Sequence, residues 1–522
     1  MKVKIYDTTL RDGSQAEGIS FSVADKIRIA LELDKIGVDY VEGGWPGSNP
    51  KDIAFFDQIR DYDLKNTKIA AFGSTRRANT LAQDDANLNK LIESEAPVVT
   101  MFGKSWDLHV LEILKTTLDE NLKMIFDSIK FTKSHGRTSF FDAEHFFDGY
   151  KSDPKYAIET IKSASDAGAD CIILCDTNGG TMPGEILSIV EAVRKAVVTP
   201  IGIHCHNDSG LAVANSLLSV EAGAVHIQGT VNGFGERSGN ADLTSIIPNL
   251  KLKYGYDVVT DKQLTKLCDL SQFVDELANR RHNSMAPYVG LSAFAHKGGM
   301  HVNAVQKNPI SFEHVNPKLV GNKRRVLISE LSGRSNIFLK AKELNIDLKA
   351  NTPEVKEILQ KLKDLEHAGY DFEAAEASFE LLVRKTLQKH KNFFDLISMR
   401  IIVEERGGEI VTEATLKIQV NSVVEYTVAE GDGPVNAMDN ALRKALKRFY
   451  PSLVDVELVD FKVRVIEGTK GTGAKVRVLI ESQCDGEIWG TVAASENIIE
   501  ACWKALSDSV EYKLLKDELN KA

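Results

Sequence analysis

Eight short runs of apolar and β-branched residues recur through the first 255 residues, and helical patterns separate most of them. The runs are Val3–Tyr6, Tyr40–Glu42, Lys68–Phe72, Val98–Phe102, Thr138–Asp142, Cys171–Cys175, Gly202–Cys205 and His226–Thr230. The amphipathic segments include Val23–Ile36, Leu108–Ser134, Pro154–Ala167, Gly184–Ala196 and Leu211–Ala222. Eight such units in about 250 residues predict a (β/α)₈ barrel. An open doubly wound sheet is the alternative, but no Gly-x-Gly-x-x-Gly follows the first strand.

The remainder of the chain has a different pattern. A chain of 522 residues is too long for one hydrophobic core. From about residue 258 the sequence becomes helical and more charged, and alternating strands return from Asp395. We therefore predict an α/β protein with three parts: a barrel at 1–257, a helical linker at 258–390 and an α+β domain at 391–522. No repeat of fixed period is apparent.

Composition and charge exclude several classes of protein. The net charge of −10 argues against a nucleic-acid-binding surface. No apolar run approaches the ~18–20 residues that a membrane span needs. A strand begins at once at the N-terminus, which leaves no room for a signal peptide, and the six cysteines have no disulfide-framework spacing. We expect a cytoplasmic protein.

Polar residues follow most of the predicted strands. In a barrel, the C-terminal ends of the strands form one mouth, where the chemistry takes place. The residues that converge there are Arg11 and Asp12, Glu42 to Trp45, Asp142 and Glu144, Asp176 to Asn178, His204, His206 and Asp208, and Asn232, Glu236, Arg237 and Asn240. The sequence therefore predicts an active site at this end.

The pair His204-x-His206 indicates a metal site within that mouth. Side chains two apart on a strand point to the same face, so both imidazoles can reach one ion. Such a pair alone is weak, because core or surface histidines explain most of them. An oxygen of Asp12 and the amide of Asn240 would complete a mixed nitrogen and oxygen site, which favours Mn²⁺, Mg²⁺, Zn²⁺ or Co²⁺.

Four barrel-side motifs and three C-terminal ones resemble a known family. They are D-T-T-L-R-D-G-S-Q (7–15), H-C-H-N-D (204–208), G-F-G-E-R-S-G-N-A (233–241) and F-A-H-K-G-G-M-H (294–301), then G-D-G-P-V-N-A (431–437), G-T-G-A (471–474) and S-E-N-I-I-E-A (495–501). Together they resemble the metal-dependent Claisen-condensing acyltransferases, a family of isopropylmalate, homocitrate and citramalate synthases. The segment V-E-G-G-W-P-G-S-N-P (41–50) is most similar to the citramalate branch.

The resemblance implies a reaction and roles for residues. Acetyl-CoA would condense with pyruvate and water to give (R)-citramalate and CoA, on a route towards isoleucine, without an organic cofactor. The implied metal ligands are Asp12, His204, His206 and Asn240; the catalytic residues are Arg11, Glu144 and the base His301; Arg11, Thr177 and Asn303 would bind substrate. Near His301 this chain carries Phe312 where several family members have tyrosine. A water or another tyrosine would then assist the base.

The pocket for the side chain of the oxo acid decides the substrate. Phe72, Met101 and Phe102 would leave room for a methyl group and exclude a carboxylate. Arg76, Arg77 and Lys104 lie close enough in sequence to keep a 2-oxoglutarate enzyme, a homocitrate synthase, open, and 2-isopropylmalate synthase is the other alternative. A third hypothesis is an effector-binding protein without catalysis.

The resemblance also implies regulation by the C-terminal domain. Feedback by isoleucine or leucine is expected at loops that contain Gly431, Asp432, Gly433, Gly471 and Gly473. The same domain is expected to form a homodimer, and the helical linker to contribute to the active site.

Overall fold

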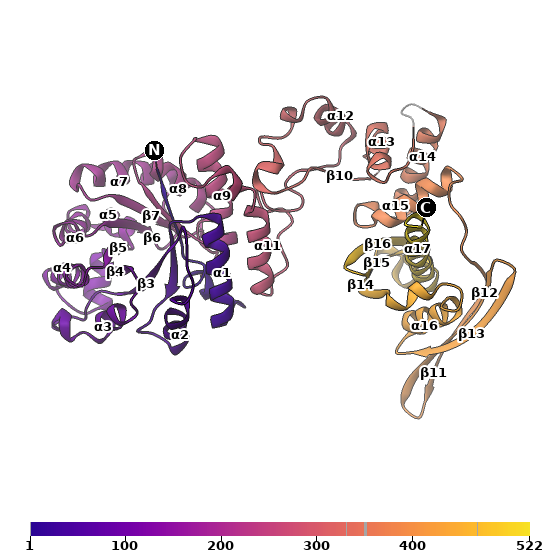
Figure 1. Cartoon of the computed structure of the whole chain (residues 1–522), viewed down its shortest axis with the longest axis horizontal. Coiled ribbons are helices and arrows are strands. Elements are labelled where there is room, and N and C mark those ends of the chain that lie inside the picture. The colour runs from indigo at the N-terminus through magenta and orange to yellow at the C-terminus, as the bar shows by residue number, and fades with distance from the viewer. Residues whose placement is uncertain (1, 330, 349–351, 467, 522) are drawn as a thin grey trace. The chain divides into compact units, whose positions relative to one another are not determined.

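The computed structural model describes residues 2–329, 331–348, 352–466 and 468–521. They form two compact units (Figure 1). The first comprises residues 1–294 and 314–324, and the second comprises residues 295–313 and 325–522. No helix among the described residues combines the length and the apolarity that a bilayer crossing requires.

The first unit is a closed parallel barrel, as predicted. Its strands pair in the order β1 to β8, and β8 closes on β1. They are β1 (Lys4–Asp7), β2 (Tyr40–Gly44), β3 (Lys68–Ser74), β4 (Val98–Lys104), β5 (Thr138–Glu144), β6 (Cys171–Asp176), β7 (Ile201–Cys205) and β8 (His226–Gly229). Each lies within two residues of the sequence prediction at both ends. Inward residues such as Tyr6, Val98, Phe140 and Ile173 fill the interior, so the barrel is a packed core.

Helices surround the strands and bury the outward-facing residues of the barrel (Figure 1). They are α1 (Val23–Ile36), α2 (Pro50–Ile59), α3 (Ala86–Glu93), α4 (Leu118–Ser134), α5 (Phe146–Ser152), α6 (Pro154–Asp166), α7 (Pro183–Ala196), α8 (Ala212–Glu221) and α9 (Leu243–Pro248), followed by α10 (Asp261–Leu264) and α11 (Leu267–Leu277). The helix predicted from Leu108 starts later than expected. Thr117 caps α4 by accepting a bond from the Glu120 amide, and a separate π-turn precedes it.

The second unit begins with several helices and two short strands. They are β9 (Ala295–His296), α12 (Gly299–Lys307), β10 (Arg325–Val326), α13 (Arg334–Glu343), α14 (Pro353–His367), the short turn η8 (Phe372–Ala374) and α15 (Glu376–Thr386). The two-residue strands β9 and β10 pair in parallel and hold the segment before α12. A hydrophobic core that includes Ile337, Ile358 and Phe379 packs α13, α14 and α15 together.

The C-terminal part is a β-β-β-α unit that occurs twice. The first copy is β11 (Asp395–Arg406), β12 (Glu409–Val420), β13 (Val423–Gly431) and α16 (Pro434–Leu446). The second is β14 (Glu457–Val465), β15 (Val476–Cys484), β16 (Glu487–Ser495) and α17 (Ile498–Leu519). Both sheets are antiparallel. No sequence repeat of fixed period marks this duplication, because the copies share little sequence beyond buried helix positions such as Ala441 and Ala505.

Candidate active site

Three predicted metal ligands meet at the mouth of the barrel. Asp12 lies in the turn after β1, His204 lies on β7, and His206 follows directly. One donor atom from each lies within 4.8 Å of the others. The Asp12 Oδ2 atom is 3.2 Å from His204 Nε2 and 3.9 Å from His206 Nε2. All three side chains are buried, and their nitrogen and oxygen donors suit a divalent ion.

The fourth predicted ligand, Asn240, joins this cluster. Its Nδ2 atom donates to Asp12 Oδ2 at 2.7 Å and lies 3.3 Å from His204 Nε2, while its buried Oδ1 atom has no hydrogen-bond partner among the described residues. Rotating the amide by 180° exchanges the two atoms and turns the oxygen towards the other donors. Gly235 makes room for this amide, because a Cβ atom there would lie 1.9 Å from Asn240 Oδ1.

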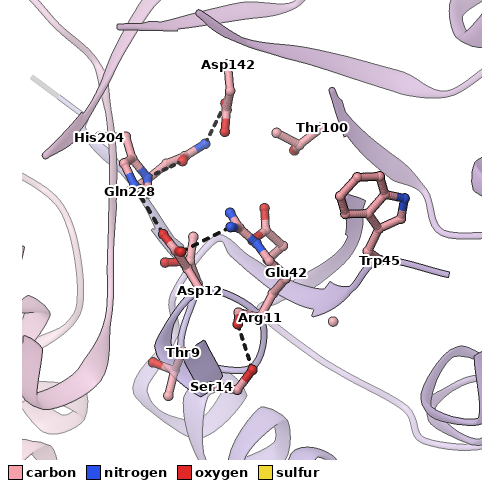
Figure 2. A network of polar contacts seen from close by, with 12 residues as sticks. Thr9, Arg11, Asp12, Ser14, Glu42, Trp45, Thr100, Asp142, His204 and Gln228 are labelled. Carbon is pink, nitrogen blue, oxygen red and sulfur yellow. Dashed lines mark hydrogen bonds and ion pairs between the residues drawn. The ribbon is translucent and has the colours of Figure 1, made fainter. Parts of the chain in front are cut away.

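A buried chain of hydrogen bonds fixes the orientation of His204 (Figure 2). The Nδ1 atom of His204 lies 2.8 Å from Gln228 Oε1, and Gln228 Nε2 donates to Asp142 Oδ1 at 3.0 Å. Because the amide oxygen can only accept, Nδ1 carries the proton and Nε2 is left free to bind metal. Burial raises the pKa of Asp142 to about 7. Sequence reasoning missed Gln228, which lies on the short strand H-I-Q-G with no local signal of its role.

Arg11 lies beside the cluster in a fixed position. Its Nε donates to Glu42 Oε2 at 2.6 Å, its Nη1 is 3.1 Å from Asp12 Oδ1, and its Cζ lies 3.7 Å from the centre of the Phe72 ring. Glu42 is fully buried and also accepts from the Tyr6 hydroxyl at 2.9 Å. Burial opposes charge on Arg11, but Asp12 and Glu42 together raise its pKa, so the guanidinium stays protonated.

The protonation of Asp12 and His206 suits metal binding. Burial opposes charge on His204, but its contact with Asp12 raises its pKa, so a bound metal would displace a proton from its Nε2 atom. Burial alone would raise the pKa of Asp12, yet Arg11 and His204 hold that pKa well below its usual range. Burial, reinforced by the nearby His204, lowers the pKa of His206 to about 3. At neutral pH Asp12 is therefore a carboxylate and His206 a neutral imidazole, the forms that bind a cation.

A cavity of about 250 Å³ opens over these residues. Arg11, Asp12, His204 and His206 line it, and Trp45, Phe72 and Phe102 form an aromatic wall. The Phe72 and Phe102 rings stack at 5.4 Å, and the edge of Trp45 packs against both. Met101 is not in the lining: it alternates with Phe102 along β4 and is buried in the core between strands and helices. Its predicted place in the substrate pocket is therefore corrected.

Glu144 and Thr177 lie on the rim of the same cavity. Glu144 forms an ion pair with Lys104. The Thr177 hydroxyl accepts from the His145 amide at 2.9 Å, and its carbonyl accepts from Arg237 Nη2 at 2.7 Å. Arg237 also donates twice to Asp208, at 2.7 and 2.9 Å, so it ties the loop after β8 to those after β6 and β7.

The cations considered for a 2-oxoglutarate pocket have other partners or positions. Arg76 is buried in ion pairs with Glu120 and Asp127, at 2.7 and 2.8 Å. Neither Arg76 nor Arg77 lines the cavity, and Lys104 is paired with Glu144.

His301 and Asn303 belong to the second unit. Both are exposed on α12, whose buried side carries Val302 and Val305. The His301 ring stacks on Phe312 with centroids 4.2 Å apart. His296 is buried and lies 3.1 Å from Glu313, in agreement with a structural role.

The expected effector loops lie at two different places in the C-terminal repeat. Gly431 ends β13, and Asp432 and Gly433 connect that strand to α16. A Cβ atom at Gly431 would lie 2.4 Å from the Ala437 nitrogen. Gly471 and Gly473 lie between β14 and β15, and Gly471 has a φ of +56°.

Comparison with family models identifies the class of protein. Residues 2–274 match the HMGL-like family, residues 288–369 match the homocitrate synthase post-HMGL domain-like family, and residues 373–514 match the LeuA allosteric (dimerisation) domain. The chain belongs to the HMGL-like family. This family depends on a divalent metal, and Asp12, His204 and His206 form a possible metal site.

Curated relatives place the chain within that family. It is 58% identical to the (R)-citramalate synthase of Geobacter sulfurreducens, over 99% of this chain and 98% of the relative, and 54% identical to that of Aquifex aeolicus over the same shares. The 2-isopropylmalate synthase of Methanocaldococcus jannaschii is 32% identical over 99% of this chain and 96% of its own. The predicted resemblance to the citramalate branch is confirmed.

Proposed function

We propose that this chain condenses acetyl-CoA with pyruvate and water to give (R)-citramalate and CoA. The observation that carries the proposal is the buried cluster of Asp12, His204 and His206 beside Arg11, at the base of a cavity large enough for a small oxo acid. The names of the relatives at 54–58% identity support the same substrates.

Asp12, His204, His206 and Asn240 would hold a divalent ion, of which Mn²⁺, Mg²⁺, Zn²⁺ and Co²⁺ all suit the donors. Such an ion supplies polarisation of the 2-oxo carbonyl. Arg11, fixed by Glu42 and stacked on Phe72, offers its free guanidinium edge to the oxygen that becomes negative during bond formation. A preorganised donor of this kind is worth about 3–4 kcal/mol.

The walls of the cavity would select the substrate. Phe72 and Phe102 offer apolar contact for the methyl group of pyruvate and no partner for a second carboxylate. Thr177, held by Arg237, presents its hydroxyl to the carboxylate of pyruvate, and Glu144 contacts both substrates. Because one methylene discriminates by only ~1–3 kcal/mol, 2-oxobutyrate should also react slowly.

His301 is proposed as the base that removes a methyl proton from acetyl-CoA, with Asn303 near the thioester. General-base catalysis contributes a factor of ~10²–10⁴. Phe312 stacks on this imidazole without supplying a hydroxyl, so a water or a tyrosine elsewhere would complete the proton path.

The C-terminal domain is proposed to form a homodimer and to bind isoleucine or leucine. The face of the β11–β13 sheet opposite α16 exposes the apolar side chains Val424, Tyr426 and Val428, at 37–68%. Contiguous exposed apolar surface marks an interaction site. We further propose three functional parts (barrel 1–257, helical linker 258–390 and regulatory domain 391–522) and a cytoplasmic location.

The test is acetyl-CoA-dependent thiol release with pyruvate, 2-oxobutyrate, 2-oxoisovalerate and 2-oxoglutarate. We expect the highest kcat/KM with pyruvate. A preference for 2-oxoisovalerate would indicate an isopropylmalate synthase, and one for 2-oxoglutarate a homocitrate synthase. Arg11→Ala is compared with Arg77→Ala, a matched control outside the cavity. If turnover is lost in Arg11→Ala alone, the chain is not a non-catalytic effector-binding protein.

A further inference from the structure

Helix α12 is anchored at its start by Lys297, the residue just before Gly298 and Gly299. The Lys297 ammonium donates to Glu373 Oε2 at 2.7 Å, and its carbonyl accepts from Asn336 Nδ2 at 3.0 Å. Gly299 lies so close to Gly333 that a Cβ atom would be 2.7 Å from the Gly333 nitrogen. The paired glycines of this motif therefore serve backbone packing, and the orientation of α12 within the second unit depends on these contacts.

Glu373 lies in a tight segment, residues 369–374, which we call the joint. Arg477 on β15 holds it with three bonds: Nε to the Gly369 carbonyl at 2.6 Å, Nη2 to the Tyr370 carbonyl at 3.3 Å, and Nη1 to the Asp371 carboxylate at 3.0 Å. Asp371 in turn accepts from the Glu373 amide at 3.3 Å. The position of Glu373 is thus set from β15.

The joint also packs against the neighbouring strand β16. A Cβ atom at Gly490 would lie 2.2 Å from the Ala374 carbonyl oxygen, so the backbone of β16 packs directly against the backbone of the joint. A polar cavity of about 530 Å³ borders Lys297, Asp371, Glu373 and Arg477. The joint is therefore in contact with the C-terminal sheet, and its ion pairs border this cavity.

Arg477 lies four residues after Gly473, in the strand that follows the second expected effector loop. The Ile466 amide donates to the Lys475 carbonyl at 2.9 Å and closes the base of that loop. A change in the loop therefore acts directly on the strand that carries Arg477.

We infer that Arg477, the joint and Lys297 form a mechanical connection through which the C-terminal domain sets the position of α12, and with it His301 and Asn303. Arg477, Glu373 and Lys297 are positioning residues and touch no substrate. The consequence for catalysis rests on the proposed function, because it requires His301 to act as the base.

The test is hydrogen–deuterium exchange of the full-length chain over residues 299–307, combined with kcat and KM for pyruvate. Glu373→Gln and Lys297→Gln should each speed exchange there about threefold, as expected for one half-exposed ion pair. Arg477 is connected to Lys297 through Asp371 and Glu373. Arg477→Gln should speed exchange over residues 299–307 about tenfold, because it removes three charge-assisted hydrogen bonds. Lys297→Glu combined with Glu373→Lys should recover wild-type exchange.

Glu357→Gln is the matched control, because Glu357 forms a similarly exposed ion pair with Lys361 inside α14 and does not touch the joint. Exchange in β12 and α16, which belong to the second unit, reports that the unit carrying each substitution is folded. Unchanged exchange over 299–307 in Arg477→Gln would overturn the inference. Variants with faster exchange over 299–307 should also have a lower kcat and an unchanged KM for pyruvate. If exchange is faster but kcat is unaltered, the connection stands and His301 is not the base.

Discussion

The orientation of His204 through Gln228 gives the sharpest prediction of the account. Gln228→Leu removes the acceptor of the His204 Nδ1 proton and the donor to Asp142 in one step. Groups that orient a metal ligand typically contribute 10–100-fold to metal affinity, or about 1.4–2.8 kcal/mol. We therefore expect the dissociation constant for Mn²⁺ or Zn²⁺ to rise by that factor.

The same substitution affects stability by a separate amount. It leaves His204 Nδ1 and Asp142 Oδ1 buried without partners, at about 1–3 kcal/mol each. The loss in free energy of unfolding of the metal-free barrel is thus about 2–6 kcal/mol, measured by chemical denaturation. Metal affinity is measured on the folded variant by competition with a chromophoric chelator at pH 7.

Two variants control for these effects. Thr160→Val removes buried hydrogen bonds elsewhere in the barrel, to Ser105 and Ala157, and should destabilise without changing metal affinity. Gln228→Glu keeps an acceptor for His204 and should recover part of the affinity. If Gln228→Leu binds metal within twofold of wild type, the reasoning about His204 is refuted.

Four further predictions follow from the site and the barrel core. Arg11→Ala should lower kcat by about 10²–10³-fold, and a smaller loss in steady-state assays would remove its role as a preorganised donor. Gly235→Ala should displace Asn240 and weaken metal binding in the chelator competition, whereas Gly180→Ala, which meets no atom within 4 Å, should leave binding unchanged. Phe102→Leu should raise kcat/KM for 2-oxobutyrate relative to pyruvate, by up to about tenfold for one added methylene; an unaltered ratio argues against the aromatic wall. Burial lowers the pKa of His226 to about 3, so the unfolded chain binds one more proton between about pH 6.5 and 3 and stability falls as the pH drops through that range. Between pH 6.5 and 5.0 wild type should lose about 1.6 kcal/mol more than His226→Phe in denaturation curves, and parallel losses would show that His226 is protonated in the fold.

The barrel could be predicted from sequence because each of its strands is buried on both faces and interrupted by turn residues. The convergence of Asp12, His204, His206 and Asn240 could also be predicted, since parallel strands bring their C-terminal ends to one mouth. Gln228 was missed because no local pattern distinguishes a buried amide that orients a ligand from one on a surface. Met101 was misplaced because a list of large apolar residues ignores the alternation that sends Phe102 inward and Met101 outward.

The C-terminal repeat was harder to predict for a physical reason. Strands such as β12 and β15 alternate between buried and less buried residues, so their apolar pattern resembles that of unrelated sheet segments. Only buried helix positions, such as Ala441 with Ala505 and Leu442 with Leu506, carry the likeness between the copies. The connection from Arg477 to Lys297 joins residues 180 apart in sequence, and such pairs become visible only in the folded chain.

The central claim is that Asp12, His204, His206 and Asn240 hold one divalent ion that a small oxo acid can reach. Anomalous diffraction at the manganese edge, from crystals grown with Mn²⁺ and pyruvate, tests it most directly. The account predicts a single strong peak about 2.0–2.2 Å from Asp12, His204 and His206, with pyruvate density between that peak and Arg11. A peak elsewhere in the barrel, or pyruvate bound away from Arg11, would contradict it.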